Sequence, residues 1–197
     1  MSRSGSPGRP GTPHMERCME ERIFGKPIIT QEEMRKRIKE LGLRIAKDYQ
    51  DKDLLMIGVL KGAFAFFADL ARAVPLPLRV DFLIVASYGD KKKSSGKVKI
   101  LTDVSQELKG QDVLVVEDIV DSGMTLSFLK KKILSRKPNS LRFCALLDKP
   151  QRRLKDVEID YVGFTIPNKY VVGYGLDYQN KYRNLPYIAV LDKIYED

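Results

Sequence analysis

The stretch Val115-Val-Glu-Asp-Ile-Val-Asp-Ser-Gly-Met-Thr125 decides how this chain of 197 residues is interpreted. Its first two residues end an apolar run that predicts a buried strand over 112–116. Two adjacent acids, Glu117 and Asp118, follow the run, and a third acid, Asp121, comes three residues after them. A Ser-Gly pair then opens a predicted helix that ends near residue 136.

This order of groups suits a ligand that carries both a phosphate and neighbouring hydroxyls. A glycine at a turn lets backbone N–H groups approach an anion, and the start of a helix supplies more of them. Ser122 and Thr125 add hydroxyl donors, while Glu117 and Asp118 offer acceptors for sugar hydroxyls or a metal. A 5-phosphoribose satisfies the whole segment. The alternative is an acidic strand end before an ordinary helix, which mutual repulsion of the acids disfavours.

Elements on both sides of this stretch predict an α/β fold with a mainly parallel sheet and helices on both faces. Thr30 and Glu33 form a capping box that predicts a helix after Thr30. Its buried stripe is Met34, Ile38, Leu41 and Ile45. The other predicted elements are strands 54–60, 80–87, 97–101, 140–147, 161–166 and 187–191, a helix at 63–74 and a flexible polar loop at 88–96. Ligands of such sheets bind outside the carboxyl ends of the strands.

Composition points to one soluble domain. Hydrophobic residues make up 43% of the chain and charged residues 31%, which is ordinary for a globular protein. We find no apolar run of about 20 residues and no signal peptide, so we expect a cytoplasmic protein without a membrane partner. Cys18 and Cys144 lie far apart and suggest neither a disulfide framework nor a zinc site. Basic clusters such as 151–155 are interpreted as solvated surface.

Residues 1–14 are rich in Ser, Gly, Pro and Arg and lack apolar periodicity. The step His14-Met15 is typical of a cloning site, so we interpret 1–14 as a disordered expression-tag scar, with a native disordered tail as the alternative. The rest, 15–197, is predicted to be a single domain. His14 is the only histidine, which excludes histidine acid–base catalysis from that domain. The net charge of +9 suits nucleic acid or small phosphorylated substrates equally.

The segment 117–125 closely resembles the ribose-phosphate signature of type I phosphoribosyltransferases, and 22–195 is similar to their hypoxanthine-guanine branch. The resemblance implies the type I fold, with a small hood or flap built from the N-terminal segment and residues beyond about 165. It implies a purine salvage enzyme that uses Mg²⁺ and phosphoribosyl pyrophosphate to convert hypoxanthine or guanine to IMP or GMP plus pyrophosphate. A homodimer or homotetramer is also implied. The implied ribose and 5-phosphate ligands are Glu117, Asp118, Asp121, Ser122, Gly123, Met124 and Thr125.

Two further motifs match the family's pyrophosphate loop and lid. Leu60-Lys61-Gly62 looks like the loop whose amides hold pyrophosphate, with a cis peptide before the lysine in the family. Ser87 and Tyr88 open the polar loop that resembles the mobile lid, whose closure would exclude water. As bare patterns, a strand-end lysine and a surface turn are the alternatives.

The remaining motifs match the purine site. Lys149 resembles the lysine that donates to the 6-oxo group, which selects 6-oxopurines over adenine. Tyr170 matches the aromatic ring that stacks on the purine, and the backbone at Val171 would read the purine edge. Asp177 matches a residue near the second magnesium, and Arg183 matches a pyrophosphate-binding arginine. The implied metal ligands are Glu117, Asp118 and Asp177.

The family reaction needs a base that removes a proton from the purine as it attacks the sugar. Asp121 is the candidate, acting toward N7, and the lack of histidine leaves a carboxylate for this role. One alternative is a catalytically silent regulator of the same fold that binds nucleotide, RNA or DNA. Another is a different base, with xanthine left open. Gly173-Tyr-Gly175 resembles part of a dinucleotide fingerprint, which we reject because no third glycine follows.

Overall fold

The computed structural model describes residues 27–90 and 93–191. The predicted scar at 1–14, Cys18 and the N-terminal part of the predicted hood lie outside these ranges. Among the described residues, no helix is both long and apolar enough to cross a membrane.

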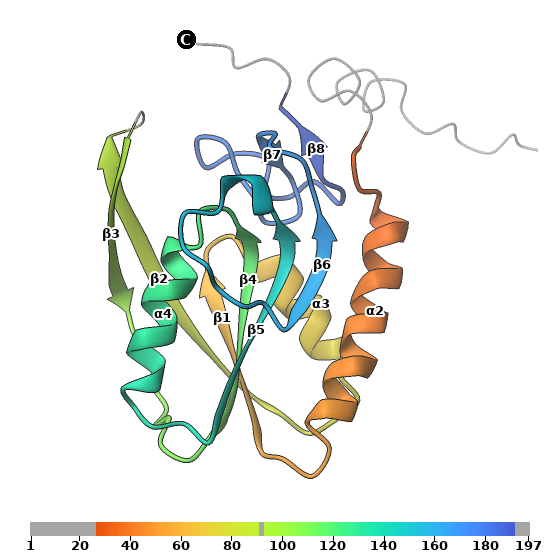
Figure 1. Ribbon diagram of the computed structural model, residues 1–197. Helices are drawn as coiled ribbons and strands as arrows, with labels where there is room; N and C mark the ends of the chain where they lie inside the picture. Colours follow the sequence, from red (N-terminus) through yellow and green to blue (C-terminus); the bar gives the residue numbers. More distant parts are fainter. Residues whose placement is uncertain (1–26, 91–92, 192–197) are drawn as a thin grey trace, which may run out of the picture.

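A six-stranded sheet in the order β3-β2-β1-β4-β5-β6 forms the centre of the molecule (Figure 1). All neighbouring pairs are parallel except β2 and β3, which are antiparallel, so the predicted mainly parallel sheet is confirmed. The strands are β1 (Leu54–Leu60), β2 (Arg79–Asp90), β3 (Lys93–Thr102), β4 (Asp112–Val120), β5 (Ser140–Asp148) and β6 (Tyr161–Thr165). The helices are α2 (Gln31–Asp48), α3 (Phe64–Ala73), α4 (Met124–Leu134) and the 3₁₀ turn η1 (Pro150–Arg152).

Helices cover both faces of the sheet, as Figure 1 shows. The apolar run of β4 explains why both faces need a cover. Leu114 and Val116 join the core cluster under α2 and α3, while Val113 and Val115 join the cluster under α4. A strand buried on both faces therefore appears as a continuous apolar run rather than as an alternating one.

The predicted capping box forms at the start of α2. The Glu33 amide donates to Thr30 Oγ1 at 3.3 Å, and the Thr30 amide donates to Glu33 Oε2 at 2.7 Å. These two bonds satisfy donors that the first helical turn leaves without partners. The predicted buried stripe is confirmed, since its four residues are at most 4% exposed.

Two predictions of element bounds are wrong. The loop predicted at 88–96 is largely strand, because Tyr88 pairs with Lys97 and Asp90 with Lys93 in the β2–β3 ladder. Cross-strand hydrogen bonds satisfy this backbone although its polar residues have weak strand propensity. The strand predicted at 112–116 extends to Val120, because β5 continues beside it and pairs Glu117 with Ala145. Glu117 and Asp118 therefore lie within β4, and Asp121 follows directly after its end.

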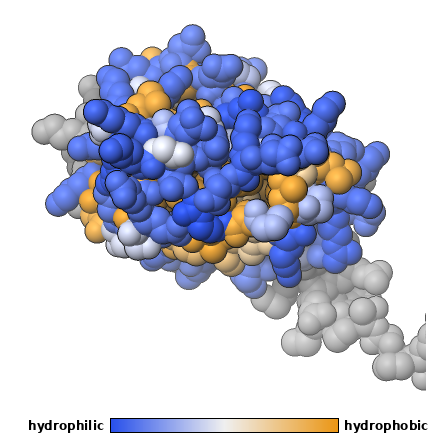
Figure 2. Space-filling view, turned by 90° about the horizontal axis from the view of Figure 1, so that it is seen from below, coloured by the Kyte–Doolittle hydropathy of each residue, from blue (hydrophilic) through white to orange (hydrophobic). Residues whose placement is uncertain are grey.

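A small second sheet, β7 (Val171–Val172) and β8 (Ala189–Val190), lies beyond the carboxyl ends of the central strands (Figure 1). Ile29 bridges to Ile188, so the segment before α2 joins this layer. The predicted strand 187–191 is reduced to β8, and β7 was not predicted. The opposite end of the molecule, seen in Figure 2, is mainly hydrophilic.

Candidate active site

A hollow of about 350 Å³ lies at the carboxyl edge of the sheet, below the second sheet. It brings together all four predicted purine-binding residues with Asp118 and Asp121 of the acidic stretch. These residues come from segments far apart in the chain, so their convergence could not be produced by local sequence. The lining residues are Asp118, Ile119, Asp121, Lys149, Arg152, Asn168, Lys169, Tyr170, Val171, Leu176 and Asp177.

The pKa values of the paired acids of β4 are both raised. Burial, followed by the neighbouring Asp118, raises the pKa of Glu117 well above its usual range. Burial also raises the pKa of Asp118, against opposing hydrogen bonds and the positive charge of Arg183. A buried carboxyl beside a half-buried one favours a ligand that donates hydrogen bonds or carries positive charge. Perturbed acids in a cleft mark a functional site.

The turn after β4 has the shape that the phosphate hypothesis requires. Gly123 has φ +79° and forms the N-cap of α4 without a side-chain cap hydrogen bond. A Cβ at this position would lie 2.4 Å from the Lys155 carbonyl oxygen, so only glycine fits. The Ser122 hydroxyl accepts from the Met124 amide at 3.4 Å. The start of α4 therefore keeps uncapped backbone donors next to the acids.

Arg153 holds this turn in place, a role that the sequence did not predict. Its guanidinium donates to the Asp121 carbonyl oxygen at 3.1 Å and forms an ion pair with Asp148. The Arg153 side chain is only 17% exposed, so the interpretation of 151–155 as solvated surface is wrong for this residue. The Leu154 and Lys155 amides both donate to the Ser122 carbonyl oxygen, which ties the same segment to the turn.

Arg152 is the second residue that sequence reasoning missed. Its Nε lies 3.0 Å from Oδ1 of Asp121, in an ion pair whose alignment does not make a hydrogen bond. Asp121 Oδ1 is itself buried and has no hydrogen-bond partner in the described structure. A buried acceptor without a donor at the wall of a hollow suits a group that receives a proton from a ligand. In the sequence, Arg152 appeared only as part of the basic cluster 151–155.

Lys149 is a buried cation on the wall of the hollow. The residue is 6% exposed, and burial lowers its pKa, while Asp121 opposes that shift. Its amide donates to the Val120 carbonyl oxygen at 2.9 Å, which ties the end of β5 to the end of β4. An ammonium group held in a low-dielectric wall favours an acceptor oxygen on the ligand.

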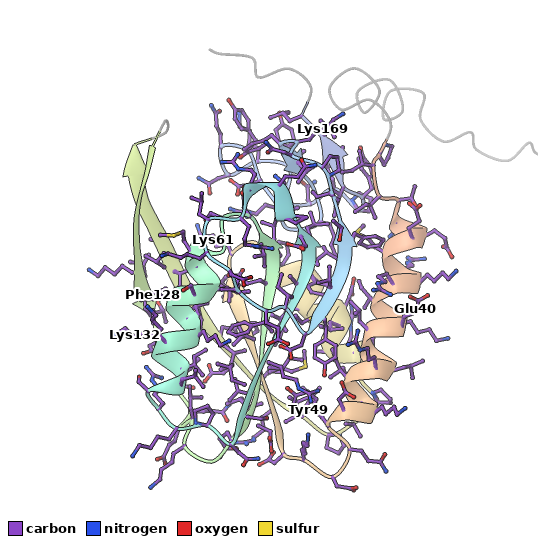
Figure 3. All side chains as sticks on the ribbon, viewed as in Figure 1. Glu40, Tyr49, Lys61, Phe128, Lys132 and Lys169 are labelled. Atoms are coloured by element: carbon purple, nitrogen blue, oxygen red, sulfur yellow. The ribbon has the colours of Figure 1, made fainter. Side chains whose placement is uncertain are left out.

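Tyr170 stands at the mouth of the hollow, where 51% of the residue is exposed. Its hydroxyl donates to the Asp177 carbonyl oxygen at 3.0 Å, and its ring meets the Tyr178 ring edge-on at 5.8 Å. These contacts fix the orientation of the ring and leave an aromatic surface at the hollow. Figure 3 shows Lys169, the neighbour of Tyr170, near the second sheet and Tyr49 at the far end of the molecule.

The predicted pyrophosphate loop lies against Asp118 and against the turn 173–175. The Leu60–Lys61 peptide bond is cis, as the family resemblance implied. A Cβ on Gly62 would lie 1.7 Å from Oδ2 of Asp118, and one on Gly175 would lie 2.1 Å from the Gly62 carbonyl oxygen. The loop backbone is therefore packed closely on both sides. Lys61 is labelled in Figure 3.

Arg183 joins this group of residues. It forms an ion pair with Asp177 at 2.7 Å and donates to the Gly175 carbonyl oxygen at 2.6 Å. Its charge also reaches Asp118, whose pKa it lowers against the effect of burial. The structure thus brings together the predicted pyrophosphate ligands, which the sequence separates by more than 100 residues.

Two predictions are left open by the structure. The side chains of Ser87 and Tyr88, the predicted lid residues, lie outside the described side chains. Within 27–90 and 93–191, no three His, Cys, Asp or Glu side chains converge on one point where they could hold a metal ion. Glu117, Asp118 and Asp177 therefore do not form a ready-made three-carboxylate centre.

Comparisons with known proteins place the chain in one family. The model of the phosphoribosyl transferase domain family matches residues 27–179. The chain is 52% identical over 176 residues to the hypoxanthine-guanine phosphoribosyltransferase of Mycobacterium tuberculosis, covering 86% of this chain and 87% of that protein. It is 50% identical over 166 residues to the Bacillus subtilis enzyme of the same name, covering 84% and 92%. The crystal structure of a hypoxanthine phosphoribosyltransferase from Staphylococcus aureus superposes with a TM-score of 0.86 at 42% identity, covering 91% of this chain and 98% of that one.

Proposed function

The chain belongs to the hypoxanthine-guanine phosphoribosyltransferase family, and we propose that it transfers a 5-phosphoribosyl group from phosphoribosyl pyrophosphate to hypoxanthine or guanine. The products are IMP or GMP and pyrophosphate, which makes the protein an enzyme of purine salvage. The observation that carries this proposal is the hollow in which Asp121 faces the same space as Lys149 and Tyr170. Its volume of about 350 Å³ suits a small planar ligand.

The sugar phosphate binds at the end of β4. The turn 122–125 offers backbone and hydroxyl donors to the 5-phosphate, and Gly123 allows the close approach. Glu117 and Asp118 accept hydrogen bonds from the 2′- and 3′-hydroxyls. This binding relieves the cost of placing the buried Glu117 carboxyl next to that of Asp118.

The leaving pyrophosphate binds on the other side of the acids. The amides of Leu60-Lys61-Gly62 and the guanidinium of Arg183 surround it with donors and positive charge. These groups stabilise charge that develops on the leaving group, which is the part of the reaction where fixed donors contribute most. Arg183 would exchange its present partner Asp177 for the ligand.

The residues fit Mg²⁺ bound together with the substrate. Mg²⁺ takes one or two protein carboxylates and completes its coordination with waters and substrate phosphates. The Glu117 carboxyl is buried next to Asp118, and both Asp118 and Asp177 line the hollow, so these carboxylates would hold the ion. When bound, the ion neutralises negative charge on the pyrophosphate.

The purine binds in the hollow between Tyr170 and the wall that carries Lys149. The ring of Tyr170 stacks on the purine, and the backbone at Val171 reads its edge. The Lys149 ammonium donates to the 6-oxo group and disfavours adenine, whose 6-amino group is a donor. Asp177 also lines the hollow, and its carbonyl oxygen accepts a hydrogen bond from the Tyr170 hydroxyl.

Asp121 acts as the general base. Its buried Oδ1 has no hydrogen-bond donor in the described structure, and it faces the hollow where N7 of the purine would lie. Asp121 accepts the proton from N7 as the attacking purine nitrogen bonds to the anomeric carbon and the bond to pyrophosphate breaks. Arg153 and the Ser122 carbonyl contacts hold the turn, so the base and the phosphate site keep a fixed relative position.

The predicted lid over Ser87 and Tyr88, the homo-oligomer and the cytoplasmic location stay predictions. The domain prediction, one unit with a hood over the sheet, is likewise proposed, supported by the Ile29–Ile188 bridge to the second sheet.

Nucleotide formation tests the proposed function. The protein is mixed with magnesium, phosphoribosyl pyrophosphate and, in separate reactions, hypoxanthine, guanine, xanthine or adenine, and absorbance is followed. We expect turnover of hypoxanthine and guanine and none of adenine, and the xanthine reaction ranks the third base. Nucleotide binding without turnover of any base would favour the silent regulator, with RNA and DNA binding as the next measurement.

A further inference from the structure

The turn Gly173-Tyr174-Gly175 holds three successive residues at positive φ, of 101°, 50° and 101°. Glycine accepts such values freely, but a bulky residue such as Tyr174 adopts them rarely. Residues held in sparsely populated backbone regions cluster at ligand sites, where the surrounding structure enforces them. The neighbouring elements of the fold therefore have to hold this turn in place.

Tyr174 is held by two hydrogen bonds, one from its backbone amide and one from its hydroxyl. Its amide donates to the Leu185 carbonyl oxygen at 2.9 Å, and its hydroxyl donates to a carboxylate oxygen of Asp69 on α3. Burial, followed by this hydrogen bond, raises the pKa of the Tyr174 hydroxyl, so it stays a donor across the working pH range. Helix α3 begins at Phe64, two residues after Gly62, so Asp69 belongs to the element that follows the loop 60–62.

The same turn contacts both parts of the proposed pyrophosphate site. Gly175 packs its Cα against the Gly62 carbonyl, where a Cβ would lie only 2.1 Å from the oxygen. The Gly175 amide donates to the Arg183 carbonyl oxygen at 2.9 Å, and its own carbonyl oxygen accepts from the Arg183 guanidinium at 2.6 Å. The turn is thus the piece of backbone that joins the loop 60–62 to the arginine.

We propose that Tyr174, through its hydrogen bond to Asp69, is a positioning residue that holds the loop 60–62 and Arg183 together as one pyrophosphate-binding unit. The assignment of pyrophosphate to this unit rests on the proposed function. Tyr174 acts through the loop and the arginine and does not line the purine hollow. The hydroxyl–carboxylate bond ties the turn to α3 at one point, and the Gly175–Gly62 contact ties it to the loop at another.

Tyr174→Phe tests this role because it removes one hydroxyl and keeps the ring. We expect the KM for phosphoribosyl pyrophosphate to rise roughly 3- to 10-fold, the range for losing an ordinary hydrogen bond, because the hydroxyl acts on the ligand only through the loop and the arginine. The KM for hypoxanthine and the affinity for IMP should change less than about twofold, because neither involves the pyrophosphate. A merely structural role would shift all three constants together or leave all three unchanged, and either outcome overturns the proposal.

Two further variants isolate the hydrogen bond from the other partner of Asp69. Arg72 forms an ion pair with Asp69, and its side chain is 76% exposed. Arg72→Gln removes that pair and keeps the tyrosine bond, so wild-type constants are expected. Asp69→Asn keeps an acceptor for the hydroxyl and should behave closer to wild type than Asp69→Ala. Equal defects in the two Asp69 variants would contradict a role for the bond.

Direct binding separates this proposal from the proposed function. Calorimetry with inorganic pyrophosphate and magnesium requires no turnover, and we expect the Tyr174→Phe protein to bind roughly 3- to 10-fold more weakly than wild type. Equal affinities, or no binding by wild type, would overturn the positioning role. If the two proteins differ in their affinity for pyrophosphate as expected but wild type forms no nucleotide, the result would instead contradict the proposed function.

Discussion

Replacement of Gly175 by alanine tests how closely the turn and the pyrophosphate loop are packed. Gly175 has φ +101°, and its added Cβ would lie 2.1 Å from the Gly62 carbonyl oxygen. The backbone conformation costs about 1–3 kcal/mol for a residue with a side chain. Overpacking against a fixed backbone atom adds about 1–3 kcal/mol. We therefore expect Gly175→Ala to lower the free energy of unfolding by about 2–6 kcal/mol.

Gly110→Ala is the matched control. Gly110 has φ +71°, and nothing lies within 4 Å of a Cβ built there, so only the backbone term applies, about 1–2 kcal/mol. Urea unfolding of both variants measures the difference, which at a slope of about 2 kcal/mol per molar corresponds to roughly 1 M in the midpoint. Equal midpoints for the two variants would refute the close contact between Gly175 and Gly62. Kinetics of Gly175→Ala should also show a raised KM for phosphoribosyl pyrophosphate.

Two further predictions concern buried charge. Because the pKa of Glu117 is raised in the folded state, its contribution to stability is complete at acid pH and is lost as pH rises through the folded-state pKa. Glu117→Gln should therefore have a higher urea midpoint than wild type at neutral pH. The difference between the two midpoints should disappear on acidification. Urea midpoints that are equal, or that differ by the same amount at every pH, would contradict the burial of a carboxyl with a raised pKa at this position. The lowered pKa of Lys149 predicts that kcat/KM for hypoxanthine falls at a lower pH than an ordinary lysine would allow. Lys149→Gln should lose about 10- to 100-fold in kcat/KM together with that alkaline decline, and a pH profile that keeps the decline would assign it to another group.

Local sequence rules predicted much of the fold. The capping box at Thr30 and the apolar run of β1 gave element bounds close to those observed, because caps and buried strands depend on near neighbours. The end of β4 and the hairpin near Asp90 were missed. Both depend on pairing with another strand, which a polar local sequence does not reveal.

In the candidate site too, sequence motifs predicted some residues, while the roles of others depend on tertiary contacts. Family motifs predicted Lys149, Tyr170 and Asp121, and the structure places them on one hollow. Arg153 and Tyr174 were not predicted as parts of the site. Arg153 reaches a backbone carbonyl and Asp148, and Tyr174 reaches a helix 105 residues away, so both roles depend on tertiary contacts without a local pattern.

The central claim is tested most directly by measuring the turnover of Asp121→Ala and of wild type with hypoxanthine and saturating phosphoribosyl pyrophosphate. The claim is that the acid on this hollow removes the purine proton, so we expect kcat to fall by roughly 10²- to 10⁴-fold, with binding of phosphoribosyl pyrophosphate largely kept. Near-normal turnover in the variant would contradict the assignment of Asp121 as the base and the mechanism built on it.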